Sequence, residues 1–85
     1  EKALAINPYN PSANIYLAKI EYENNNLNKS IYHLQKVLIT EPKNFVVHYR
    51  LSELFDKLNK KQEATFYFER AVDLQRLHHF SQNKK

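Results

Sequence analysis

The sequence repeats itself at the offset that separates Pro8 from Pro42. Each of these prolines follows an apolar run that ends in a polar residue, and an Asn stands two residues after each proline. At this offset, small residues align with small ones and large apolar residues with large apolar ones: Leu17 with Leu51, Ala18 with Ser52, Ile20 with Leu54, Ser30 with Ala64, and Leu34 with Phe68. Such a period is typical of repeat proteins, in which each unit buries its apolar face against a neighbour.

Within each repeat, apolar residues recur at spacings of three and four, which predicts pairs of amphipathic helices. We expect helices over about residues 11–24, 28–40, 45–58 and 61–80, and an all-α chain. Asn44 is a suitable N-cap, and Pro11 is suited to the first helical position after Asn10. Asn25 and Asn59 stand at the turns between paired helices. Asn adopts the left-handed conformation more readily than other non-glycine residues, so both are expected to have a positive φ.

The composition excludes several classes of protein. The chain has 85 residues, enough for one domain, and contains no glycine and no cysteine. Rossmann and Walker phosphate loops need glycine where the backbone approaches the ligand, so neither is expected. Without cysteine there is no disulfide, thiol nucleophile or thiolate metal site. No apolar run approaches the roughly 20 residues that span a membrane. We therefore expect no membrane partner. The sequence leaves the location unknown and favours an intracellular one, in the cytoplasm or nucleus.

A helix–turn–helix period of about 34 residues with these small and large positions resembles the tetratricopeptide repeat family. The resemblance covers nearly the whole chain. It implies that residues 1–10 end a preceding repeat (a helix stub and a turn), that 11–44 and 45–78 form two full repeats, and that 79–85 form a helix end and a basic tail. The implied fold is a stack of helix–turn–helix repeats in a right-handed α-solenoid, here a fragment of a longer array.

The sequence also departs from the family pattern. Asn14 and His48 stand where the family usually has an aromatic residue, and Arg76 replaces the closing proline of the second full repeat. Without that proline the last helix is expected to continue to about Phe80. Leu74, Leu77 and Phe80 then lie at a spacing of three on one stripe. A following repeat or a second copy of the chain would cover this stripe, which is therefore a candidate repeat edge or oligomer interface.

The resemblance implies a non-catalytic scaffold that binds a peptide or protein segment in a concave groove, or packs within a multisubunit assembly. The residues expected to line the groove are Ile15, Tyr16, Lys19, Tyr49, Arg50 and Glu53. The tyrosines offer rigid contact area, and Lys19 and Arg50 can hold an acidic side chain or a terminal carboxylate. The alternative is an ordinary solvated helix face.

A terminal-carboxylate clamp of the kind found in chaperone-binding members of the family is not expected. That clamp needs Asn or Lys at positions occupied here by Ile15, Tyr16 and Val46. Arg50 fits one clamp position, which is too few to hold a carboxylate. The expected partner is therefore a protein or peptide bound in another way.

Other chemistries find little support in the sequence. His78 and His79 are adjacent, so on a helix they point about 100° apart, and His33 and His48 lie in different repeats. We expect surface or interface histidines, with no metal site, no cofactor and no catalytic residues. The alternative function is a helical repeat that binds RNA or another nucleic acid through Lys57, Lys60, Lys61, Lys84 and Lys85, in a chain of net charge +4. Glu53, Asp56 and Glu63 dilute this charge, which disfavours that alternative.

Overall fold

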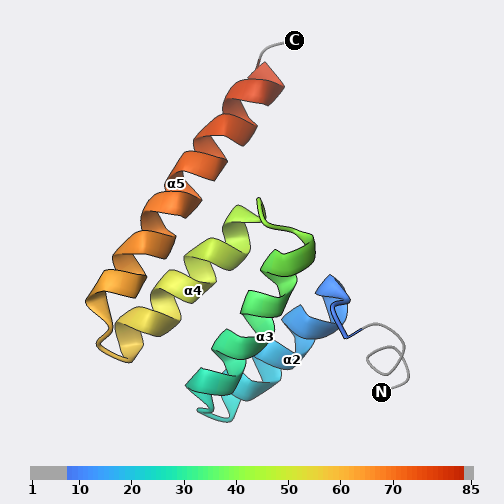
Figure 1. Cartoon of the computed structure of the whole chain (residues 1–85), viewed down its shortest axis with the longest axis vertical. Helices are drawn as coiled ribbons and strands as arrows, with labels where there is room; N and C mark the ends of the chain where they lie inside the picture. The colour runs from blue at the N-terminus through green and yellow to red at the C-terminus, as the bar shows by residue number, and fades with distance from the viewer. Residues whose placement is uncertain (1–7, 84–85) are drawn as a thin grey trace. The chain divides into compact units, whose positions relative to one another are not determined.

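The computed structural model describes residues 8–83, with side chains up to His78, and contains no strand in this range. Its helices are α2 (Pro11–Glu23), α3 (Leu27–Thr40), α4 (Phe45–Lys57) and α5 (Lys61–Asn83) (Figure 1). The all-α prediction is confirmed, and the first three helices agree with the predicted bounds to within one residue. The helix stub predicted near the N-terminus falls on residues 1–7, outside the described residues.

The chain divides after Pro42 into two compact units. The first unit is the pair α2 and α3, and the second is the pair α4 and α5. Corresponding helices begin at the offset of the sequence repeat, since the start of α2 aligns with that of α4, and the start of α3 with that of α5. The period read from the sequence is therefore also the period of the secondary structure.

The helices that open the two units begin at matching asparagine caps. The Asn10 side-chain oxygen accepts the Ala13 N–H at 2.9 Å, and the Asn44 oxygen accepts the Val47 N–H at 3.1 Å. Each bond satisfies a backbone donor that has no partner within the helix. The N-cap predicted at Asn44 and the helix start predicted at Pro11 are both confirmed.

The turns within the two units have the same geometry. Asn25 has φ of 64° and Asn59 has φ of 63°. In the first turn, the Asn26 N–H donates to the Glu21 carbonyl and the Asn25 N–H to the Tyr22 carbonyl. The second turn repeats this pattern, with Lys60 donating to Phe55 and Asn59 to Asp56. These paired bonds form a Schellman motif, which needs a left-handed residue just past the helix end. The predicted positive φ is confirmed at both asparagines.

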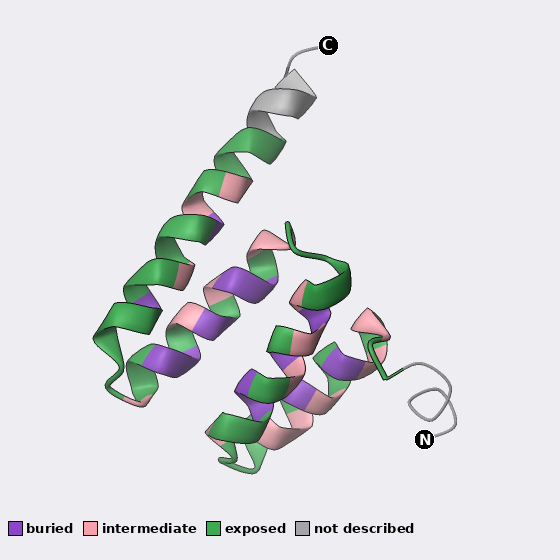
Figure 2. Cartoon of the chain, viewed as in Figure 1, coloured by how far each residue is buried: buried purple, intermediate pink, exposed green. Residues whose placement is uncertain are grey.

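Small residues allow the paired helices to approach each other. In the first unit Ala18 and Ser30 are buried, and the Ser30 hydroxyl donates to the Ala18 carbonyl at 2.8 Å, joining α3 to α2. In the second unit Ala64 and Ala71 of α5 are buried, as is Leu51 of α4. Figure 2 shows buried positions along the facing sides of each helix pair. The small positions Ala18, Ser30, Ala64 and Ala71 thus lie in the interior, whereas the small position Ser52 is half-buried.

Two expectations about buried residues are wrong. His48, expected at the surface or at an interface, is buried in the second unit, where its ring lies 5.8 Å from the Tyr67 ring. Phe68, expected to fill the space between helices, is 51% exposed, whereas its counterpart Leu34 is 5% exposed. In each case the packing of the helix pair, rather than the polarity of the residue, decides which side of the helix faces inward.

Candidate interaction surfaces

The predicted contact residues of the first unit lie on the outer side of α2. Asn14 and Ala18 are the buried residues of this helix, so the side chains of Ile15, Tyr16 and Lys19 project away from α3. All three are exposed, and Tyr16 is 65% exposed. This surface presents a large aromatic ring and an aliphatic side chain beside an ammonium group.

The predicted contact residues of the second unit lie on α4 and differ from one another. Arg50 and Glu53 are exposed, whereas Tyr49 is half-buried. The Tyr49 ring lies edge-on to Phe68 at 5.8 Å, and its hydroxyl donates to Gln75 Oε1 at 2.8 Å. Tyr49 therefore connects α4 to α5, a role that the sequence did not indicate.

The predicted repeat edge lies along the last helix. Leu74 is half-buried and Leu77 is 64% exposed, while the side chain of Phe80 is outside the described residues. His78 lies 5.6 Å from the ring of Phe45, the first residue of α4. Since α5 has 23 residues and α4 has 13, the C-terminal part of α5 extends past the start of α4 (Figure 1).

A buried amide organises the start of the first unit. Asn14 is fully buried, and its Nδ2 donates to the carbonyls of Pro8 at 2.8 Å and Asn10 at 3.0 Å. Its Oδ1 lies 3.0 Å from His33 Nδ1 on α3. Because both amide hydrogens are used, Oδ1 is the acceptor in this last bond and His33 Nδ1 carries the proton. Asn14 thus ties the segment before α2 to both helices.

The environment of His33 favours its neutral form. Burial lowers the pKa of His33 below its usual value of 6.5, and the ammonium groups of Lys36 and Lys29 lower it further, while Glu21 acts in the opposite direction. A neutral imidazole protonated on Nδ1 still donates to Asn14. The bond therefore does not require a charged histidine in the interior.

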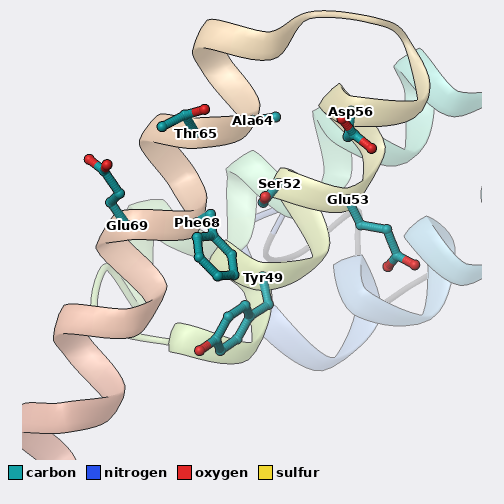
Figure 3. A pocket seen from close by; sticks show the side chains of 8 residues that line it. All are labelled: Tyr49, Ser52, Glu53, Asp56, Ala64, Thr65, Phe68 and Glu69. Atoms are coloured by element: carbon teal, nitrogen blue, oxygen red, sulfur yellow. The ribbon is translucent and has the colours of Figure 1, made fainter.

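An open groove in the second unit was not found from the sequence. It is lined from α4 by Tyr49, Ser52, Glu53 and Asp56, and from α5 by Ala64, Thr65, Phe68 and Glu69 (Figure 3). The sequence pattern assigned Phe68, Ser52 and Ala64 to the core, and residues of the core are not expected to line an open groove. The charge and spacing of the acidic residues were visible in the sequence, but the exposure of Phe68 was not.

The described residues offer no metal site, since no three His, Cys, Asp or Glu side chains among them are grouped to hold an ion. No helix in the same range is long and apolar enough to cross a membrane.

Two helix pairs whose starts, caps and turns recur at one common offset define a helical repeat protein. The chain belongs to the family of the TT21 fifth ARM repeats domain, whose family model matches residues 11–83. No curated protein matches the chain. The resemblance to tetratricopeptide repeats was therefore correct as to a helical repeat, but the matching family is one of ARM repeats.

Proposed function

We propose that the chain is a non-catalytic interaction module in which the exposed faces of α2 and α4 contact a protein or peptide segment. The observation that carries this proposal is the exposure of Tyr16 and Ile15 beside Lys19, on a helix whose opposite side forms the core. Tyrosine is enriched among residues that dominate binding, because it offers a large rigid surface and a hydroxyl.

The positively charged residues of these faces indicate the charge of the segment that they would bind. Lys19 lies one turn after Tyr16 and Ile15 on α2, and Arg50 is exposed on α4. A guanidinium or ammonium group binds a carboxylate through charge-assisted hydrogen bonds. The segment contacted by these faces is therefore expected to combine an apolar residue with an acidic one.

We further propose that each of the two units is built as a tetratricopeptide repeat, with a first helix that carries the binding face and a second helix that packs behind it. Their period matches the roughly 34 residues of tetratricopeptide repeats, whereas armadillo repeats are typically about 40–47 residues long. On this plan α2 and α4 are each the first helix of a repeat, the helix whose exposed face the resemblance assigns to binding. The same plan allows packing of repeat ends within a multisubunit assembly.

The proposal is tested by capture of a partner with the tagged chain. The double variant Tyr16→Ala with Arg50→Ala should reduce capture at least about tenfold, because both substitutions remove exposed contacts. Tyr49→Ala is unsuitable, since Tyr49 also holds α4 to α5. Tyr32→Ala is a matched control, because Tyr32 is an exposed tyrosine on α3, outside the proposed faces. Circular dichroism should show unchanged helix content in both variants.

Packing through the repeat edge is distinguished with Leu77→Lys. If the edge mediates assembly, this variant lowers the mass measured by light scattering and loses capture, while the Tyr16 and Arg50 variant retains it. Full capture by both variants would rule out the helix faces and the edge alike.

A further inference from the structure

The groove between α4 and α5 has an apolar floor. It is an open groove of ≈ 600 Å³ within the second unit. Phe68 is 51% exposed and packs edge-on against Tyr49. Ser52 and Ala64 lie beside them (Figure 3) and are small enough for another backbone to approach closely. This combination of small and large residues suits the packing of a helix.

The corresponding surface of the first unit is not exposed in this way. In the aligned repeats Leu34 occupies the position of Phe68 and Ile31 that of Thr65, and both Leu34 and Ile31 are buried. Thr65 and Phe68 are both exposed. The same structural positions are thus buried in one repeat and open to solvent in the other. Because a repeat buries its apolar face against a neighbour, the open surface is suited to a packing partner.

The groove is acidic although the chain is basic. Glu53 and Asp56 line it from α4 and Glu69 lines it from α5, and no Lys or Arg is among its lining residues. Lys61 pairs with Asp56 at 2.7 Å, but both side chains are well exposed, so the pair only partly neutralises the carboxylate. The whole chain nevertheless carries a net charge of +4. The occupant that complements this groove is apolar at its centre and basic at its edges.

We propose that the groove binds an amphipathic helix of a partner protein, with an apolar stripe on the floor and Lys or Arg residues facing Glu53, Asp56 and Glu69. The lining residues recur at spacings of three and four along α4 and α5, so each helix presents a ridge. A third helix can pack its own ridge between two such ridges. This inference deepens the proposed function and rests on it, since it names the chemistry of a partner for the second unit.

The test uses two synthetic helical peptides with the same leucine stripe, one flanked by lysines and the other by glutamates. Binding to the full chain is measured by fluorescence anisotropy, and the contact is mapped by amide chemical shifts. We expect the lysine peptide to bind at least about tenfold more tightly. General charge attraction would favour the glutamate peptide, because the chain is basic, so the expected preference is diagnostic of the groove.

Charge reversal identifies the residues involved. Glu53→Lys with Glu69→Lys should abolish the preference for the lysine peptide, and Phe68→Ala should weaken binding of both peptides. Glu23→Lys is the matched control, since Glu23 is an exposed carboxylate of the first unit and its reversal should leave the preference unchanged. The charge reversals change exposed side chains, so they test the groove even if Phe68→Ala alters folding.

Other outcomes overturn the inference. Equal binding of the two peptides, or preference for the glutamate peptide, excludes a basic partner. Shifts confined to α2 place the contact elsewhere, which leaves the proposed function standing without this groove. Dimers of the wild-type chain that dissociate in Phe68→Ala identify a second copy as the occupant instead.

Discussion

Asn14 uses both hydrogens and the oxygen of its amide in the interior of the first unit. Asn14 stands at a position where tetratricopeptide repeats usually have an aromatic residue. Its amide makes hydrogen bonds where an aromatic ring would make apolar contacts. A buried amide is tolerated only when its hydrogen bonds are made, because an unpaired polar group in the interior is costly. At this residue, stability depends on three specific hydrogen bonds.

Asn14→Ala is therefore expected to destabilise the chain by about 1–3 kcal/mol, the usual cost of leaving buried polar partners unsatisfied. Urea denaturation followed by circular dichroism measures this loss. Asn28→Ala is a suitable control, because Asn28 is exposed on α3 and its removal should change stability by no more than about 0.5 kcal/mol. Equal effects at the two sites would show that the Asn14 network contributes nothing.

The helix elements are ended by two asparagines in the left-handed region. Asn25 and Asn59 close α2 and α4 with the same pair of backbone hydrogen bonds. Asn takes here the place that glycine usually has at a helix C-terminus, which explains how a chain without glycine forms two tight turns. The turns depend on this conformation. It brings the N–H groups of the asparagine and of the residue after it within hydrogen-bond distance of carbonyls in the last turn of the helix.

Substitutions at Asn59 test this account of the turn. Asn59→Ala should destabilise the chain by about 1–2 kcal/mol, because a β-carbon without a compensating polar group disfavours a positive φ. Asn59→Gly should be close to neutral, since glycine adopts this conformation without steric cost. Both are measured by urea denaturation. A Gly variant as unstable as the Ala variant would mean that the asparagine side chain, and not the backbone, determines the turn.

At the scale of the whole molecule, positive charge is spread among negative groups. The lysine cluster Lys57, Lys60 and Lys61 lies at the turn between α4 and α5, and Lys61 is paired with Asp56. The neighbouring groove is lined by carboxylates. Phosphate binding benefits from a continuous basic surface, which this part of the second unit does not present.

We therefore expect weak binding of single-stranded RNA. At physiological salt the dissociation constant for RNA should be about 10⁻⁶ M or higher, since non-specific contacts typically have dissociation constants of about 10⁻⁴–10⁻⁶ M. Fluorescence anisotropy with a labelled RNA at about 50 and 200 mM salt measures the affinity and its salt dependence. Tighter binding with a steep fall in salt would favour the nucleic-acid alternative over a protein scaffold.

The period, the helix bounds and the turn conformations could all be predicted from the sequence. The period is visible directly as a pattern repeated at the offset of Pro8 and Pro42. The helix starts and the turns depend on residues close together in the chain: an asparagine and the N–H three residues on, or an asparagine and the preceding turn of helix. Of the candidate surfaces, the exposure of Tyr16 and Leu77 agrees with the expected projection of these residues. Their role in binding stays a prediction. The second role of Tyr49 could not be predicted, because it involves Phe68 and Gln75 on the partner helix.

The sequence by itself determined that this chain is all-α, where its helices begin and where its turns take a positive φ. These properties are local, because caps, helix spacing and left-handed residues act over a few positions. Only the tertiary structure decided that Asn14 and His48 are buried while Phe68 stays half exposed above a groove lined by carboxylates. Burial depends on which helix faces meet, and residues far apart in the chain bring those faces together.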